Sequence, residues 1–264
     1  MIWPFKKTRR HAFSPREAIP SGLVDVHSHI LWGLDDGPAS PEASDEMCRV
    51  YRELGYRTVV ATPHHNHSMF DDPGGDAIRS RISRLAERNP EGPEILAGGE
   101  IMFDDTVWDR IAAGELPTLG PSKTYLVEFS PHPGGIPPGL DETIFRFQLK
   151  EIAVLIAHCE RYPELASDRE RLERLRTAGA IVQVNTMSLA GRYGRTHMKT
   201  AWSLLEEGLV DLLATDLHNP ADARWILDAL EEAHQWDPRA LERLVSTNPG
   251  AVAAGDPWSV KRDA

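Results

Sequence analysis

Residues 23–29 read LVDVHSH, a short apolar run that ends in two histidines with one serine between them. A nearly continuous apolar run of this length is typical of a parallel strand that is buried on both faces. Both imidazoles then lie at the carboxyl end of the strand, where the chain turns and successive side chains need not alternate between faces. His27 and His29 can therefore reach the same metal ion.

Similar runs recur along the chain, separated by helical patterns. Strands are predicted at 23–27, 57–62, 94–100, 124–129, 152–158, 180–185 and 211–216. Helices are predicted at 41–54, 76–88, 104–113, 142–151, 168–178, 196–207 and 221–233, with a last one near 238–246. Seven successive β-α units predict a parallel sheet, either open and doubly wound or closed into a barrel. The GxGxxG turn of a dinucleotide-binding fold does not follow the first strand.

One predicted helix has clear signals at both ends. Ser40 is the expected N-cap, Pro41 fills the first helical position, and Gly55 follows the last residue. The sequence therefore predicts a helix that begins at residue 41 and ends at residue 54.

Length and composition fit a single α/β domain. The chain has 264 residues, of which 41% are hydrophobic and 26% are charged. No run approaches the roughly 18 to 20 apolar residues that span a bilayer, and the opening MIWPF is too short for a secretory signal. We therefore expect a cytoplasmic protein. The net charge of −11 argues against nucleic acid as a partner, because such binding needs basic residues that neutralise phosphates.

Residues 1–21 are predicted to be a basic, disordered tail ahead of one domain at 22–264. Residues 1–22 carry five basic residues against one acidic residue, a charge of +4. Together with Trp3 and Phe5, the KKTRR stretch could bind an anionic membrane surface, which would hold the protein at the inner membrane face. The alternative is a solubilising lead-in with no binding role.

The cysteines exclude one kind of phosphatase. Cys48 and Cys159 are too few for a disulfide framework or a paired CxxC zinc site. A thiol phosphatase needs a nucleophilic cysteine followed six residues later by an arginine, but these positions hold Leu54 and Leu165. Any phosphatase chemistry here must therefore use another nucleophile.

Imidazoles and carboxylates follow almost every predicted strand, at the end that builds the active site in parallel barrels. The candidate metal ligands are His27, His29, Asp36, His64, Glu100, Glu128, His158, Asp216 and His218. Mixed histidine and carboxylate ligands suit Zn, Mn or Fe, and this set exceeds the coordination of one ion, so two or three ions are expected. His65 and His67 either line the pocket or belong to a polar loop.

Together these motifs resemble a known superfamily. The stretches are DVHSH (25–29), DDG (35–37), ATPHH (61–65), GE (99–100), EFS (128–130), AHCERY (157–162) and ATDLHN (214–219). Over about residues 22–255 they resemble the PHP (polymerase and histidinol phosphatase) superfamily, and within it the tyrosine phosphatases of bacterial capsule and exopolysaccharide biosynthesis. The resemblance implies a distorted (β/α)7 TIM-like barrel with parallel strands and outer helices. Thr215 departs from the small Ser or Ala-like residue expected there.

The resemblance also implies a trinuclear metal site, usually with Mn²⁺; Zn²⁺, Fe²⁺ and Co²⁺ are alternatives. The first ion would be held by His27, His29, Glu100 and Asp216, the second by Glu100, Glu128 and His158, and the third by Asp36, His64 and His218. Arg161 would bind the substrate phosphate and act in catalysis, and His65 is a candidate substrate contact. The alternative for Arg161 is a surface arginine paired with Glu160 or Glu164.

The expected activity is hydrolysis of phosphotyrosine by attack of a metal-bound hydroxide. The expected substrate and partner is an autophosphorylated bacterial tyrosine kinase that regulates polysaccharide synthesis. One alternative is a small-molecule phosphatase of the histidinol-phosphate type. A metal-dependent amidohydrolase is a second, although it normally relies on a carboxylated lysine where this chain has Glu128. A regulatory domain without metals is a third, and the complete ligand set argues against it.

Overall fold

The computed structural model describes residues 19–262. Its strands are β1 (Leu23–Ser28), β2 (Tyr56–Ala61), β3 (His64–His65), β4 (Glu94–Ala97), β5 (Glu100–Met102), β6 (Thr124–Glu128), β7 (Ala153–Ile156), β8 (Ile181–Asn185) and β9 (Leu212–Ala214). Each region predicted as a strand overlaps at least one of them.

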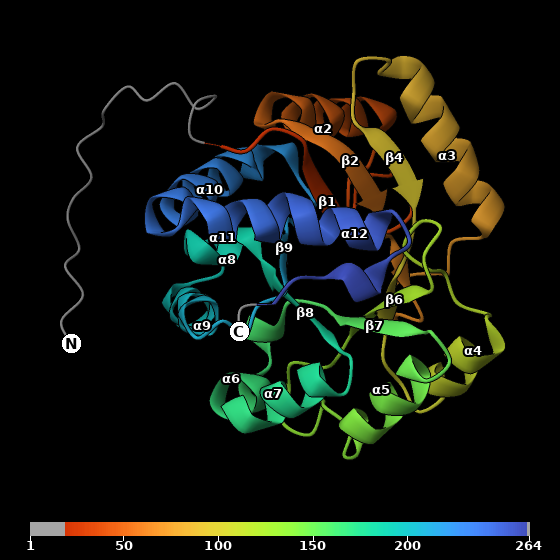
Figure 1. The fold of residues 1–264 in the computed structure, drawn as a ribbon. Coiled ribbons are helices and arrows are strands. Elements are labelled where there is room, and N and C mark those ends of the chain that lie inside the picture. The colour runs from red at the N-terminus through yellow and green to blue at the C-terminus, as the bar shows by residue number, and fades with distance from the viewer. Residues whose placement is uncertain (1–18, 263–264) are drawn as a thin grey trace.

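Helices follow the strands and surround them (Figure 1). They are α2 (Pro41–Leu54), α3 (Gly75–Arg88), α4 (Val107–Ala113), α5 (Leu140–Gln148), α6 (Pro163–Ser167), α7 (Arg169–Thr177), α8 (Thr186–Leu189), α9 (Arg195–Glu206), α10 (Ala223–Trp236), α11 (Pro238–Glu242) and α12 (Asn248–Ala253). Short 3₁₀ turns are η1 (Cys159–Arg161), η2 (Pro220–Asp222) and η4 (Pro257–Ser259), and η3 (Arg243–Thr247) is a π-helical turn.

The strands pair in parallel and form a ring. They make two sheets, in the orders β1-β2-β4 and β3-β5-β6-β7-β8-β9. On one side the chain itself links the sheets, because β2 leads through Pro63 into β3, and β4 leads through Gly98 and Gly99 into β5. On the other side Ser28 of β1 forms a parallel bridge with Leu217, which follows β9. As a result β1 lies beside β9, although they come from opposite ends of the chain (Figure 1). The predicted (β/α)7 barrel with outer helices is confirmed, and the open sheet is not.

One of the predicted strands is divided, and another is followed by a short strand that was not predicted. Pro63 has no N–H to donate and separates β2 from β3, while Gly98 and Gly99 separate β4 from β5. The backbone at these glycines is crowded, because a Cβ on Gly98 would lie 2.7 Å from Cγ1 of Val60 and one on Gly99 2.4 Å from Cγ of Pro117. The strand predicted at 57–62 corresponds to β2, whereas the prediction of one unbroken strand at 94–100 was wrong, because that region holds β4 and the start of β5.

Side chains alternate along each strand between the barrel interior and the surrounding helices. In β7, for example, Leu155 belongs to the interior cluster and Val154 to the outer one. The interior cluster comprises Val24, Val26, Val60, Leu119, Leu126, Ala153, Leu155, Ala157, Ile181, Leu212, Ala214, Val252 and Ala253. The last two come from α12, which packs across one end of the barrel. Toward the carboxyl ends the interior positions become polar, as in the step from Leu126 to Glu128.

Helix boundaries agree best where capping signals are strong. The helix predicted over 41–54 is confirmed: Oγ of Ser40 accepts a hydrogen bond from the N–H of Ala43 (3.3 Å), and Gly55 ends the helix with φ 89°. Other predicted boundaries shift by one to three residues, and the region near 238–246 divides into α11 and η3. The helices α6, α8 and α12 were not predicted, because each is shorter than two full turns.

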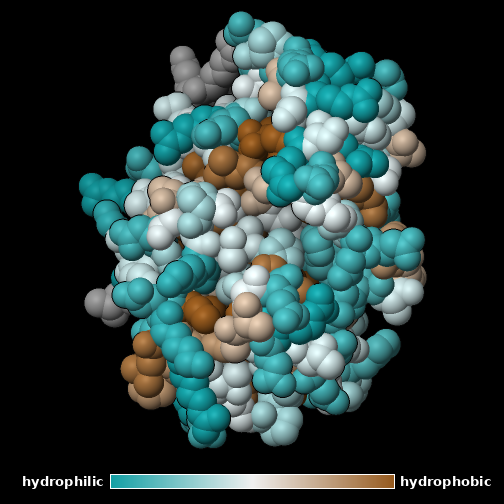
Figure 2. Space-filling view, turned by 90° about the vertical axis from the view of Figure 1, so that its right-hand side faces the viewer, coloured by the Kyte–Doolittle hydropathy of each residue, from teal (hydrophilic) through white to brown (hydrophobic). Residues whose placement is uncertain are grey.

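Among the described residues, no helix combines the length and the apolar character that a membrane crossing requires. The side of the molecule that Figure 2 shows is mostly hydrophilic, with hydrophobic residues in small separate patches. Residues 1–18 of the predicted basic tail lie outside the described part of the chain.

The strand break gives a test of the barrel geometry. Gly99→Ala should lower the free energy of unfolding by about 1 to 3 kcal/mol, because its Cβ would overlap Pro117 and also approach Cδ2 of His65 to 2.5 Å. Gly74→Ala is the control, since nothing lies within 4 Å of its Cβ position. Chemical denaturation of both variants measures the difference, and equal stability would contradict the close approach at Gly99.

Candidate metal centre

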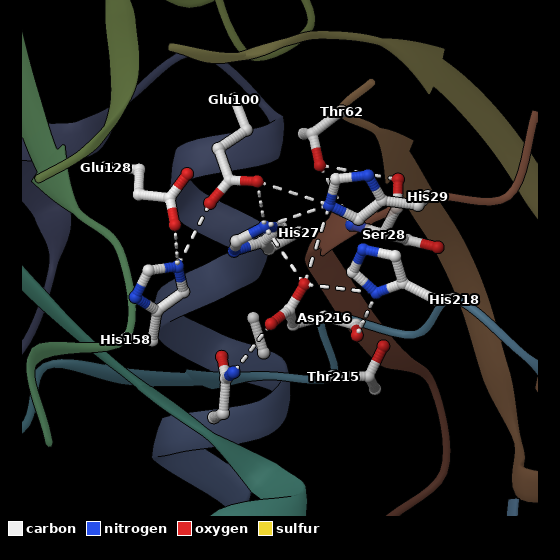
Figure 3. Close-up of polar contacts among 12 residues, drawn as sticks. His27, Ser28, His29, Thr62, Glu100, Glu128, His158, Thr215, Asp216 and His218 are labelled. Carbon is white, nitrogen blue, oxygen red and sulfur yellow. Dashed lines mark hydrogen bonds and ion pairs between the residues drawn. The ribbon is translucent and has the colours of Figure 1, made fainter. Parts of the chain in front are cut away.

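The candidate ligands come together at the carboxyl end of the barrel, although they are spread over most of the chain. Figure 3 labels all of them except Asp36 and His64. His27 lies in β1 and His29 just after it, Asp36 lies before α2, His64 in β3, Glu100 in β5, Glu128 in β6, His158 after β7, and Asp216 and His218 after β9. Donor atoms of eight of these residues form three overlapping groups, and the ninth, His158, lies beside Glu100 and Glu128.

The deepest group contains His27, His29, Glu100 and Asp216, all of them buried. Nε2 of His27 and Nε2 of His29 each lie 3.2 Å from Oε2 of Glu100. The same two nitrogens lie 3.4 and 3.5 Å from Oδ1 of Asp216. Two imidazoles and two carboxylates thus face one point, an arrangement that could hold a divalent cation.

A second group lies on the other side of Glu100. Oε1 of Glu100 is 3.1 Å from Nε2 of His158, and the same nitrogen is 3.5 Å from Oε1 of Glu128. The other oxygen of Glu100, Oε2, which faces His27 and His29, also lies 3.2 Å from Nδ1 of His64. Glu100 therefore directs one carboxylate oxygen to each side, as a bridging ligand between two ions would.

The third group lies at the mouth of the barrel. Oδ1 of Asp36 is 3.5 Å from Nε2 of His64 and 3.2 Å from Nε2 of His218, and His29 completes the group. The Asp36 side chain is 52% exposed, in contrast to the buried Glu100. An ion held here would be the most accessible to substrate.

Three histidines are also fixed through the ring nitrogen that faces away from the centre. Nδ1 of His27 bonds Oε1 of Gln183 (3.1 Å), and Nδ1 of His29 donates to Oδ2 of Asp35 (2.7 Å). In His158 the partner of Nδ1 is the hydroxyl of Tyr162 (3.2 Å). Such partners orient metal-ligating imidazoles. Sequence reasoning assigned these supporting residues no role; the available signal was a polar residue within an apolar strand, as with Gln183.

Two of the candidate ligands have unusual backbone conformations. His158 has φ 30° and Asp216 has φ 52°, in the left-handed region that residues other than glycine seldom adopt. The barrel wall thus turns sharply at the ends of β7 and β9, and both side chains remain buried at the centre.

The charges of the cluster fit a set of bound cations. Burial, and next the negative charges of Glu100 and Asp216, raise the pKa of Glu128 to about 9, and its Oε2 is buried with no hydrogen-bond partner among the described residues. Burial and nearby Arg161 lower the pKa of His158 to about 4, which leaves the imidazole neutral, as a metal ligand must be. Divalent cations would balance the carboxylates and give the orphaned oxygen a partner.

A pocket of about 380 Å³ opens over the cluster. Its lining includes Arg161, whose Nη2 lies 3.1 Å from Oδ2 of Asp216. The ion-pair partner of Arg161 is thus Asp216, and not Glu160 or Glu164, the alternatives considered from the sequence. His67 lines the pocket, whereas His65 is buried and is not among the lining residues, so its expected substrate contact gains no support.

Comparison with known sequences identifies relatives. Residues 23–253 match the family described as "Capsular polysaccharide synthesis, CpsB/CapC". The chain is similar to the tyrosine-protein phosphatase YwqE of Bacillus subtilis, with 33% identity over 75% of this chain and 78% of the relative. It is also similar to the tyrosine-protein phosphatase CpsB of Streptococcus pneumoniae, with 31% identity over 75% and 83% of the two chains.

Solved structures agree with these matches. A crystal structure from work on YwqE of Bacillus subtilis and CpsB of Streptococcus pneumoniae, described as metal-dependent tyrosine phosphatases, superposes with a TM-score of 0.80. It has 28% identity and covers 91% of this chain and 97% of that one. The histidinol phosphate phosphatase of Lactococcus lactis, with 13% identity, a TM-score of 0.51 and coverage of 81% and 94%, shares the fold alone.

The two thiols should be chemically silent. Burial raises the pKa of Cys48 to about 12 and that of Cys159 well above its usual value, so neither is a thiolate at neutral pH. Native protein at pH 7.5 should react with iodoacetamide only after unfolding, as mass spectrometry would show. The double variant Cys48→Ala, Cys159→Ala should keep its catalytic rate. Rapid labelling of the folded protein, with matching loss of activity, would contradict this.

Proposed function

Because the chain belongs to the CpsB/CapC family of capsular polysaccharide synthesis, we propose that it is a metal-dependent phosphatase that hydrolyses phosphotyrosine in proteins. The observation that carries the proposal is the position of Glu100 between two groups of imidazoles. Its two oxygens face His27, His29 and His64 on one side and His158 on the other, at 3.1 to 3.2 Å. Sites of this kind, with two or more ions, suit phosphate ester hydrolysis.

The ligand assignment is part of this proposal. The first ion would be held by His27, His29, Glu100 and Asp216, the second by Glu100, Glu128 and His158, and the third by Asp36, His64 and His218. Close contacts between donor atoms within each set support it. We propose Mn²⁺ as the native metal, because this mixture of carboxylate and imidazole ligands suits it, as it also suits Zn²⁺ and Fe²⁺.

Divalent ions in such a cluster supply a nucleophile from water at neutral pH and neutralise the charge of the phosphate. The protein itself contributes the guanidinium of Arg161, which lines the pocket and can donate two N–H groups to phosphate oxygens. These donors stabilise the charge that spreads over the equatorial oxygens in the transition state. Tyrosine is a good leaving group, so an aryl ester needs less help from a general acid than an alkyl ester.

The proposed substrate is a phosphotyrosine-bearing protein of polysaccharide synthesis, with an autophosphorylated tyrosine kinase on the cytoplasmic side as the first candidate. The family match and the names of the relatives support this choice. Binding of the basic tail to an anionic membrane stays a prediction from the sequence, because residues 1–18 lie outside the described part of the chain.

Removal of metal should abolish the activity. Purified protein should contain two or three divalent ions per chain by elemental analysis, and EDTA should stop hydrolysis of a phosphotyrosyl peptide. Separate addition of Mn²⁺, Zn²⁺, Co²⁺ and Mg²⁺ identifies the metal, and histidinol phosphate serves as the competing substrate. Full activity of metal-free protein would refute the metal mechanism, and faster hydrolysis of histidinol phosphate than of the phosphotyrosyl peptide would refute phosphotyrosine as the substrate.

The His27→Ala variant should lose bound metal, whereas the Asp76→Ala variant, which changes a fully exposed carboxylate, should keep it.

Arg161→Ala should reduce the rate on phosphotyrosyl peptide at least about a hundredfold, because it removes charge stabilisation from the transition state. Arg161→Lys should restore only part of the rate, since an ammonium group cannot form the two-pronged contact. Metal content and melting temperature should change little. A variant with all its metals and a rate within about threefold of the original would remove Arg161 from the active site.

A further inference from the structure

Arg161 is held by a second contact besides Asp216. Its guanidinium carbon lies over the ring of Tyr193, 4.5 Å from the ring centre. Tyr193 lines the same pocket, from the loop between α8 and α9. Cations are attracted to the face of an aromatic ring, most strongly where water is largely excluded.

A second arginine also approaches the Tyr193 ring. The guanidinium of Arg192 lies 5.8 Å from the ring centre, and Asp222 fixes it in place. Nε of Arg192 donates to Oδ1 of Asp222 (2.8 Å) and Nη2 to Oδ2 (3.3 Å). Tyr193 therefore interacts with two guanidinium groups, and each of these pairs with a carboxylate.

The loop that carries Tyr193 is tied to the turn that carries Arg161. Glu160, which precedes Arg161, is buried and accepts hydrogen bonds from the N–H of Asn185, at the end of β8, and from the hydroxyl of Ser188, within α8. After α8 the chain turns back, with a bond from the N–H of Arg192 to the carbonyl of Met187 (3.1 Å). The separation between Tyr193 and Arg161 is thus fixed by the Glu160 side chain and by the turn after α8, as well as by their own contact.

The two contacts of Arg161 differ in whether they use the guanidinium N–H groups, which a phosphate would need as donors. The N–H groups of a guanidinium lie in its plane, and Asp216 uses one of them. An aromatic ring uses the face and occupies no N–H. When a phosphate accepts hydrogen bonds from Arg161, the ring can therefore keep the side chain, with its long flexible stem, directed into the pocket.

We propose that Tyr193 is a positioning residue that holds the Arg161 guanidinium ready for the substrate phosphate. The proposal rests on the proposed function, because it takes Arg161 as the phosphate-binding group. The ring is the active part of Tyr193, and its hydroxyl is dispensable.

The test compares Tyr193→Leu, which removes the ring, with Tyr193→Phe, which keeps it. Two quantities are measured on the metal-loaded protein: kcat/KM on phosphotyrosyl peptide, and the inhibition constant of inorganic phosphate. Phosphate has no aryl group, so its binding reports on Arg161 without any contact between Tyr193 and the tyrosine ring of the substrate. Melting temperature and metal content accompany both.

Tyr193→Leu should weaken phosphate binding and lower kcat/KM by about three- to thirtyfold, the range expected for a partly buried cation–π contact, while Tyr193→Phe stays within about twofold. In an Arg161→Ala background, Tyr193→Leu should have no further effect on either quantity. A full effect in that background, or loss of peptide turnover with unchanged phosphate binding, would mean that Tyr193 contacts the substrate directly and would overturn the proposal. Failure of the original protein to hydrolyse the peptide would instead refute the proposed function.

Discussion

The barrel closes where its first strand meets its last, and this closure depends on one buried carboxylate. Asp25 in β1 accepts hydrogen bonds from the backbone N–H and the hydroxyl of Thr215, next to β9, and from the hydroxyl of Tyr51 in α2. It also accepts one from the N–H of His27. A buried carboxylate is costly unless such donors surround it, so this set of bonds strongly favours one register of β1 against β9. These bonds also give a reason for a threonine at position 215, because an alanine there would lack the hydroxyl that donates to Asp25.

The same closure determines the geometry of the metal centre. His27 and His29 follow Asp25, and Asp216 and His218 follow Thr215, so both pairs of candidate ligands lie at adjoining strand ends. Two backbone bonds across the seam keep them in register: the N–H of Asp216 to the carbonyl of His27 (2.8 Å), and the N–H of His29 to the carbonyl of Leu217 (3.0 Å). The fold thus brings four donors together before any ion contributes binding energy, which reduces the entropic cost of forming the site.

Most of the fold and of the candidate site could be read from the sequence, because almost every predicted strand is an apolar run followed by an imidazole or a carboxylate. What the sequence did not reveal are contacts between distant segments. The partner of His27, Gln183, lies 156 residues away, and Arg161 pairs with Asp216 rather than with a neighbouring glutamate. The division of the strands at Gly98 escaped prediction for the same reason, since the crowding arises only after β2 and β4 are side by side.

His158 and Asp216 adopt a left-handed backbone conformation, so neither is the residue type that would be most stable at its position in the barrel. Glycine or asparagine would adopt these conformations with less strain, and strain of this kind costs on the order of 1 to 3 kcal/mol per residue. A designer who optimised the barrel for stability alone would therefore replace both residues and obtain a sturdier scaffold with an incomplete site. At these two positions the chain therefore carries a local backbone strain together with a side chain that can bind a metal ion.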